Sequence, residues 1–140
     1  MVINQGMRRL KPIKLKPYNE CSVNERHGAG IYLMVFPSGM KYVGRSKNIL
    51  RRLNGHIYSF FKPRENDWHR EGVKEFCPAA KNKDDVWKGF WRQVAFYIMP
   101  CEEGEEYELE DRALIEITIN GKRNEYYNTA YPIKEEELIW

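Results

Sequence analysis

The sequence lacks the features that would place the protein in a membrane or in an oxidising compartment. No run approaches the roughly 18 consecutive apolar residues of a transmembrane helix, and the N-terminus has no apolar stretch typical of a secretory signal. The three cysteines, Cys21, Cys77 and Cys101, form no CxxC pair and are odd in number, which argues against a disulfide framework and a structural zinc site. We therefore expect a cytoplasmic protein with reduced thiols and no membrane partner.

The sequence also has no internal repeat and no low-complexity tract, and it is too short for several domains. The 140 residues, 42% of them hydrophobic, suit one compact domain with little room for a separate target-recognition domain. We expect a basic N-terminal arm over residues 1–26, a main domain over 27–133 with an irregular insert at about 62–92, and a C-terminal tail over 134–140.

Acidic residues are scarce in the first half of the chain. Residues 1–64 hold 13 Lys and Arg against 2 Glu, a net charge of +11, whereas residues 65–140 hold 10 basic and 18 acidic residues, a net charge of −8. A positive surface attracts a polyanionic backbone through phosphate contacts and counterion release. The asymmetry therefore indicates a nucleic acid as partner, although flexible basic segments that bind nothing are also common.

The pattern of a β-hairpin follows the basic arm. A β-branched and aromatic run, Gly30–Phe36, precedes the turn signal Pro37-Ser38-Gly39 and a second short run, Met40–Gly44. The alternation of side chains along a strand does not assign Tyr32 and Val43 to a common face. Two tyrosines on neighbouring strands can nevertheless border one pocket.

The segment after the hairpin has the pattern of an amphipathic helix. Ser46 or Asn48 can cap its N-terminus. Its apolar positions follow helical spacing, at Ile49, Leu50, Leu53 and Ile57. Arg52 and His56 are four residues apart, so a cation and an imidazole share one flank of this helix.

Residues 62–92 show no clear period and are expected to be irregular. The breakers in this segment are Pro63, Gly72, Pro78 and Gly89. Its apolar anchors are Trp68, Phe76, Trp87, Phe90 and Trp91. These aromatic side chains can stack on unpaired bases or pack in a satellite core, and we favour packing.

A third strand and a second helix follow the insert. Gln93–Met99 is too apolar and too β-prone for a surface loop, so it predicts a central strand that ends at Pro100 and pairs with the hairpin. An acidic start at Glu102–Glu106 and an apolar stripe that runs to Asn120-Gly121 predict a helix.

The last residues predict a loop over 122–133, with an edge strand near Tyr126–Ala130, and a turn of helix over Lys134–Leu138. The expected order of elements is therefore strand, strand, helix, insert, strand, helix. This order is that of an α+β domain.

The hairpin and the helix after it carry a motif. Gly-Ile-Tyr stands at 30–32, Tyr-Val-Gly follows nine residues later at 42–44, and then come Arg52 and His56. The stretch resembles the GIY-YIG endonuclease superfamily, with Val43 in place of an isoleucine, which keeps an apolar, β-branched side chain. The resemblance implies a small central three-stranded antiparallel sheet flanked by helices, and an enzyme that cuts nucleic acid phosphodiesters.

The resemblance further implies one divalent ion, Mg²⁺ or Mn²⁺, held by a glutamate in the helix after the third strand. Glu110 is the best match because it follows the strand by about the expected interval and precedes Leu114-Ile115. Glu116 is the rival because it lies twelve residues before Asn128, a spacing that other members show, although it would put Asn120-Gly121 where the helix should continue. Without the resemblance, a carboxylate on an acidic helix is a solvated surface residue.

The polar residues of the motif acquire implied roles as well. Arg52 would stabilise the transition state, since a guanidinium stays charged and grips phosphate in bidentate fashion. Tyr32 would polarise or deprotonate water and needs help from a charge or a metal-bound water, because its ordinary pKa is near 10. Tyr42 would orient the nucleophile or the phosphate, and His56 would carry a proton or contact the phosphate.

Supporting roles are expected for Gly30, Gly44 and Asn128, with Asn128 bracing the site by hydrogen bonds. The basic residues expected to contact DNA are Arg45, Lys47, Arg51, Arg8 and Arg9. His27 and His69 lie in no comparable context.

We interpret the chain as a DNA endonuclease that acts as a monomer or homodimer. A non-catalytic nucleic-acid-binding module of the same fold is the alternative, because the metal-binding glutamate is ambiguous. A purely structural interaction domain would leave the charge of residues 1–64 unexplained. The resemblance is dense over 30–56, thinner over 94–128 and absent from the arm and the insert, so the unmatched parts must set the target.

Overall fold

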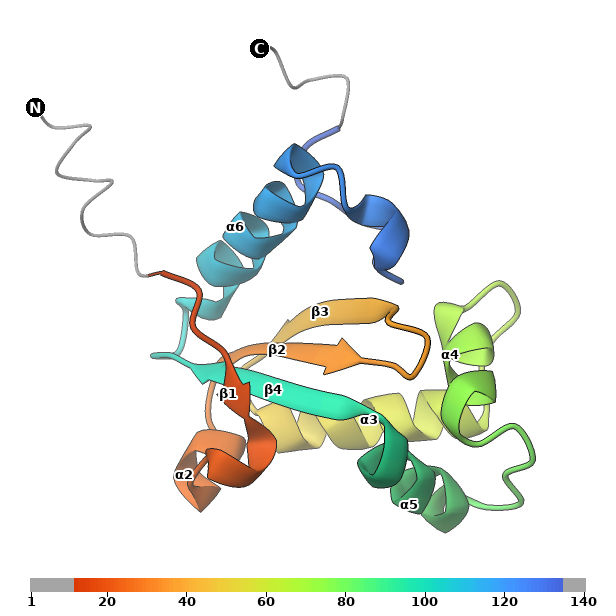
Figure 1. The fold of residues 1–140 in the computed structure, drawn as a ribbon. Helices are drawn as coiled ribbons and strands as arrows, with labels where there is room; N and C mark the ends of the chain where they lie inside the picture. Colours follow the sequence, from red (N-terminus) through yellow and green to blue (C-terminus); the bar gives the residue numbers. More distant parts are fainter. Residues whose placement is uncertain (1–11, 135–140) are drawn as a thin grey trace, which may run out of the picture.

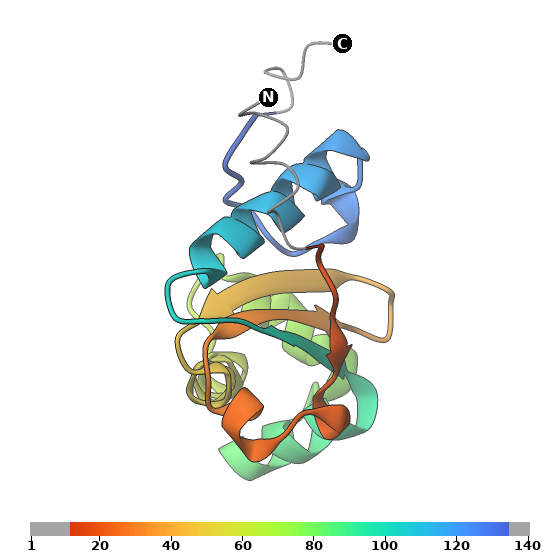
Figure 2. The ribbon, with the colours of Figure 1, turned by 90° about the vertical axis from the view of Figure 1, so that its left-hand side faces the viewer.

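The computed structural model describes residues 12–134, which form an α+β fold around one antiparallel sheet (Figure 1). The elements in chain order are β1 (Lys16–Pro17), η1 (Tyr18–Glu20), α2 (Val23–Arg26), β2 (Gly30–Val35), β3 (Lys41–Ser46), α3 (Ile49–Phe61), α4 (Trp68–Phe76), α5 (Lys83–Gln93), β4 (Ala95–Pro100), α6 (Glu106–Ile119) and η2 (Arg123–Glu125). Helix α6 covers one face of the sheet, and α3 and α5 lie on the other (Figures 1 and 2). None of the helices in this part of the chain has the length and apolar character of a membrane crossing.

The register of the hairpin decides where its tyrosines point. β2 and β3 pair with Tyr32 opposite Gly44 and Met34 opposite Tyr42. Residues that lie opposite each other on neighbouring strands share a face of the sheet. The side chains of Tyr32 and Tyr42 therefore lie on the same face, whereas Val43, which pairs with Leu33, lies on the other. The sequence left the faces of Tyr32 and Val43 open because it does not give the register.

The predicted three-stranded sheet is wrong by one strand. Over residues 12–134 the sheet has four strands, in the order β1-β4-β2-β3. β1 is only two residues long and pairs with Tyr97 and Ile98 of β4. A Lys-Pro segment of this length has no alternating pattern that would mark it as a strand. The predicted third strand is confirmed at Ala95–Pro100, where it pairs antiparallel with β2.

Each face of the sheet has its own core. On the face toward α3, α4 and α5, the larger core buries aromatic and aliphatic side chains, among them Tyr32, Met34, Ile49, Leu53, Phe60, Phe76, Phe90 and Ile98. On the face toward α6, a smaller core buries Val43, Ala113, Leu114 and Ile117. β3 is an edge strand, so side chains from helices on both faces can meet beside it.

The insert is not irregular, because it contains α4 and α5. Asp67 and Asn82 cap these helices through their side chains. The two glycines that indicated breaks lie inside the helices, where neighbours come close. A Cβ at Gly72 would lie 3.1 Å from the ring of Phe60, and one at Gly89 would lie 2.9 Å from a backbone oxygen of the preceding helix. Close packing, rather than a helix end, explains these glycines.

The aromatic residues of the insert pack against the sheet and against one another. Phe76 and Phe90 are buried in the larger core, and Trp68, Trp87 and Trp91 are partly buried against it. The preference for packing is therefore confirmed for these side chains.

The second long helix is confirmed at Glu106–Ile119, and it ends at the predicted stop, with Gly121 at φ +65°. The predicted edge strand near Tyr126–Ala130 is wrong. The chain runs beside β3 but forms a single bridge, between Lys41 and Tyr126. Most of the predicted terminal helical turn, residues 135–138, lies outside the described residues.

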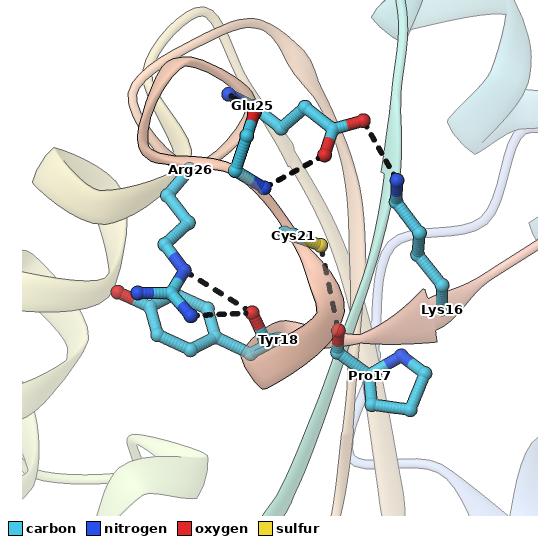
Figure 3. A network of polar contacts seen from close by, with 7 residues as sticks. Lys16, Pro17, Tyr18, Cys21, Glu25 and Arg26 are labelled. Carbon is cyan, nitrogen blue, oxygen red and sulfur yellow. Dashed lines mark hydrogen bonds and ion pairs between the residues drawn. The ribbon is translucent and has the colours of Figure 1, made fainter.

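Residues 16–26, which we assigned to the basic arm, are folded against the sheet (Figure 3). The Lys16 ammonium pairs with Glu25 at 2.7 Å. The Arg26 guanidinium donates two hydrogen bonds, of 3.1 and 3.0 Å, to the backbone oxygen of Tyr18 and lies over the ring of the same residue. These two cations thus have partners within the protein.

Candidate active site

A cavity of about 460 Å³ lies beside β3, at the edge of the sheet. The residues that line it are Tyr32, Tyr42, Gly44, Arg45, Arg52, Trp68, Glu110, Leu114, Tyr127, Asn128, Thr129 and Ala130. They come from β2, β3, α3, α4, α6 and the segment after η2. Four of the five predicted catalytic residues therefore face one space, and the fifth, His56, lies directly behind Tyr32.

Tyr32 enters the cavity across a glycine. Its side chain is 1% exposed, and its ring crosses Gly44 so closely that a Cβ on residue 44 would lie 2.3 Å from the phenolic oxygen. Burial raises the pKa of Tyr32, and the nearby charge of Arg52 opposes that rise. The phenol is therefore neutral at physiological pH.

Gly30, the first residue of the motif, allows a close approach of the backbone on the other side of β2. A Cβ there would lie 2.5 Å from the backbone oxygen of Met99 on β4. No side chain fits at this distance, so Gly30 allows β2 and β4 to pair closely.

Arg52 is positioned by the start of α3. The side chain of Asn48 caps this helix by accepting the N–H of Arg51 at 3.1 Å, which decides between Asn48 and Ser46 as the cap. Leu53 and the other apolar residues of α3 face the core, so Arg52 projects from the flank toward the two tyrosines. The guanidinium forms a positive wall of the cavity.

Tyr42 forms part of an aromatic wall that the sequence did not predict. Its ring stacks on Trp68 of α4, with centroids 4.3 Å apart and planes 18° apart, and Trp68 in turn stacks on Tyr127. The hydroxyl of Tyr127 donates to Glu75 of α4. Burial raises the pKa of Tyr42, with Arg52 acting against it. The predicted insert therefore supplies one side of the cavity.

Glu110 lines the cavity, whereas its rival Glu116 is exposed on α6. The buried residues Leu109 and Leu114 fix the rotation of α6 and turn Glu110 toward β3. Its side chain is 12% exposed and forms an ion pair with Arg45. Burial raises the pKa of Glu110, and Arg45 opposes this effect.

The donor set of the cavity fits Mg²⁺, which takes oxygen ligands and typically keeps several waters beside one or two carboxylates and substrate phosphates. Glu110 is the carboxylate that would hold it. No group of three or more His, Cys, Asp or Glu side chains that could hold a metal ion comes together within residues 12–134.

His56 is the first member of a buried chain of polar groups. Its Nε2 lies 2.6 Å from the hydroxyl of Tyr32, and its Nδ1 lies 2.8 Å from Nε2 of His69. Nδ1 of His69 lies 2.7 Å from a carboxylate oxygen of Asp67. His69, which has no context like that of His56 in the sequence, therefore lies next to His56 in the structure, whereas His27 is exposed.

Asn128 braces the cavity against the edge strand. Its side chain accepts the N–H of Val43 at 2.9 Å and donates to the oxygen of the same residue at 2.7 Å. One amide side chain thus replaces the pair of hydrogen bonds that a neighbouring strand would make. The segment that carries Tyr127 is held beside β3 in this way.

The basic residues expected to contact DNA fall into three groups. Lys47 and Arg51 are exposed. Arg45 is exposed too, but its guanidinium pairs with Glu110 and lies over the ring of Tyr107. Arg8 and Arg9 lie outside the described residues.

Comparisons of the chain with protein-family models, with curated proteins and with solved structures gave no match.

Proposed function

We propose that the protein is a divalent-metal-dependent endonuclease of the GIY-YIG type that hydrolyses DNA phosphodiesters. The observation that supports this most is the convergence of two phenols, a guanidinium and a carboxylate on one cavity, although Tyr32, Tyr42, Arg52 and Glu110 come from four elements. Phosphodiester hydrolysis requires an activated water and positive charge on the phosphoryl oxygens. The cavity offers groups for both.

The reaction forms a bond between a water oxygen and phosphorus and breaks the bond from phosphorus to the leaving oxygen. The electron pair of that bond stays on the leaving oxygen, which takes a proton from solvent water. Arg52 neutralises charge on the phosphoryl oxygens. Tyr42 holds the phosphate in line. When bound at Glu110, Mg²⁺ supplies further charge neutralisation and stabilises the leaving oxygen.

Tyr32 receives the proton of the attacking water while its own hydroxyl proton passes to Nε2 of His56, 2.6 Å away. The two transfers belong together because burial raises the pKa of Tyr32, so a free phenolate is unfavourable. A water whose proton leaves in this way becomes a nucleophile without a phenolate as an intermediate.

The second candidate function is a nucleic-acid-binding module without catalysis. The ion pair between Arg45 and Glu110 favours it, because the carboxylate that would hold the metal already has a cationic partner. In the endonuclease, Glu110 would hold the metal in place of its ion pair with Arg45, and Arg45 would then be available to a phosphate.

Nicking of supercoiled plasmid with and without Mg²⁺ separates these functions. We expect the wild type to nick in Mg²⁺, and Arg52→Ala to lose activity by about 100- to 1,000-fold while retaining DNA binding. Arg92→Ala is the matched control, because it removes the same charge from an exposed position of α5 that does not line the cavity. Binding by the wild type without nicking on plasmid and single-stranded substrates would establish the binding module instead.

A further inference from the structure

The polar chain behind Tyr32 extends into the insert, well beyond the residues of the motif. It runs from the Tyr32 hydroxyl through both ring nitrogens of His56 and both ring nitrogens of His69 to Asp67, with links of 2.6, 2.8 and 2.7 Å. All three distances are those of good hydrogen bonds. The Asp67 carboxylate also caps α4 by accepting the backbone N–H of His69 at 3.1 Å, so two bonds fix its position.

The Asp67 carboxylate, the last group in this series of hydrogen bonds, determines which group donates and which accepts in each of them. Burial works to raise the pKa of Asp67, but the two N–H groups of His69 outweigh it, so Asp67 is ionised and can only accept. His69 must then carry its hydrogen on Nδ1 and accept on Nε2. His56 consequently donates from Nδ1, which leaves Nε2 as an acceptor for the Tyr32 hydroxyl.

The two imidazoles are not equivalent as holders of a proton. His56 is 2% exposed, and burial keeps its pKa well below the ordinary value, with the neighbouring His69 and Arg52 acting in the same sense. Burial lowers the pKa of His69 as well, but there the Asp67 carboxylate opposes it. A proton that reaches His56 is therefore more stable after it has moved on to His69.

We propose that His69 and Asp67 are positioning residues for the reaction: they hold Nε2 of His56 toward Tyr32 as a proton acceptor and store the released proton away from the phosphate. The inference rests on the proposed endonuclease function. It assigns a purpose to the start of α4, a segment outside the residues that resemble the superfamily.

The proton moves in three linked transfers. The proton of the attacking water passes to the oxygen of Tyr32, the hydroxyl proton of Tyr32 passes to Nε2 of His56, and the Nδ1 proton of His56 passes to Nε2 of His69. Tyr32 and His56 end neutral, and His69 ends as a cation beside the Asp67 carboxylate. After the product has left, the proton returns along the chain to solvent in the cavity, which restores the starting tautomers.

Asp67→Asn tests the proposal without loss of the helix cap, because asparagine caps helices as well as aspartate does. We expect Mg²⁺-dependent nicking to fall about 10- to 100-fold, the usual effect of removing a group that orients a histidine. Glu71→Gln is the matched control: it removes one negative charge from an exposed position on the same helix and should leave nicking unchanged.

The pH profile separates this role from a merely structural one. Protonation of His69 before the reaction blocks the relay, so activity of the wild type falls as the pH drops through the pKa of His69. The ionisable groups that act on the two imidazoles are Tyr32 from β2, Arg52 from α3 and Asp67 before α4. Asp67→Asn removes the group that supports the cation, so the acid limb should move to lower pH.

Nitrogen-15 NMR of the ring nitrogens tests the chain independently of activity. At neutral pH we expect a hydrogen on Nδ1 and none on Nε2, for both His56 and His69. A hydrogen on Nε2 of His56, or equal nicking rates and acid limbs in the wild type and Asp67→Asn, would overturn the inference and leave the endonuclease in place. A wild type that does not nick would overturn the proposed function, and the catalytic role of the chain with it.

Discussion

Gly44 is the residue that allows Tyr32 to reach the cavity. The ring of Tyr32 lies across residue 44, in the space that a Cβ would fill. The glycine of the motif is therefore a steric requirement of the site and not a turn signal, since it lies inside β3 and pairs with β2. The position of the Tyr32 ring therefore depends on the absence of a Cβ at residue 44.

Gly44→Ala should displace the ring of Tyr32, because the new Cβ would lie 2.3 Å from its phenolic oxygen. We expect nicking to fall by about 100-fold, as a shift of about 1 Å in a catalytic group can cause. Overpacking should lower the free energy of unfolding by about 1–3 kcal/mol. Plasmid nicking and urea denaturation measure the two effects.

Gly55→Ala is the control for this substitution, because no atom lies within 4 Å of a Cβ at that position of α3. It should keep full activity and gain up to about 1 kcal/mol of stability from the better helix propensity of alanine. Full activity of Gly44→Ala would show that the position of the Tyr32 ring does not matter.

Individual site residues differed in how far the sequence could predict them. Arg52 and His56 follow from a spacing of four on one helix, which is a local property. The choice between Glu110 and Glu116 needed the rotation of α6 against β3, which depends on packing. His69 was missed because its partner His56 lies on another helix, and no local pattern marks a contact between elements.

Both insert helices, α4 and α5, belong to the core, and α4 belongs to the site as well. α4 supplies Trp68 to the cavity wall and His69 to the buried chain. Phe60 of α3 connects these helices, and it is 1% exposed. Its ring centroid lies 5.1 Å from that of Phe76 in α4 and 6.2 Å from that of Phe90 in α5. The three helices therefore depend on one another for their positions.

Phe60→Ala should lower the free energy of unfolding by about 3–5 kcal/mol, the usual cost of deleting a buried aromatic side chain. Tyr58→Ala on the same helix is the control, since that side chain is 53% exposed and should change stability by less than about 0.5 kcal/mol. Urea denaturation measures both. If Phe60→Ala lowered the free energy of unfolding as little as Tyr58→Ala does, α4 and α5 would not be anchored through α3.

Elements whose apolar residues recur with a strong period were predicted well, and the other elements were not. The hairpin, the third strand and the two long helices have clear alternation or helical spacing, and all are present. The helices of the insert were missed because two glycines that serve close packing indicated helix ends instead. β1 and the bridge at Tyr126 are too short for any period, so only their partners in the sheet define them.

The whole molecule keeps two histidines buried and largely neutral, which links its stability to pH. Burial is the main reason that the pKa values of His56 and His69 are lowered. The unfolded chain takes up protons at both residues below about pH 6.5, whereas the folded chain does so only at lower pH. Their contribution to stability is therefore present above that pH and is lost as the pH falls toward the folded pKa values.

We expect the free energy of unfolding to be lower at about pH 5.5 than at about pH 7.5, as measured by urea denaturation. Glu110 acts in the opposite sense, because burial raises its pKa and so favours folding at lower pH. Repeating the pair of measurements with Glu110→Gln removes that contribution and should enlarge the difference. Equal stability at the two pH values would mean that the histidines are not held neutral.

Some cations of the basic half of the chain have partners within the fold. Lys16 and Arg26 of the basic half bind Glu25 and the backbone of Tyr18, and Arg45 pairs with Glu110 of the acidic half. Exposed cations such as Lys47 and Arg51 remain available to phosphate. The number of cations that can meet a phosphate therefore depends on their partners in the fold, because the counts in the sequence do not distinguish paired from free cations.

The most direct test of the account compares two carboxylates on the same helix in Mg²⁺-dependent plasmid nicking. Glu110→Gln should lower the rate by more than the roughly 10- to 100-fold that loss of a supporting residue causes, because it removes the metal ligand itself. Glu116→Gln, which is exposed on α6, should nick like the wild type. Equal rates for the two variants, or loss of activity with Glu116→Gln alone, would contradict the claim that the cavity at β3 is the active site.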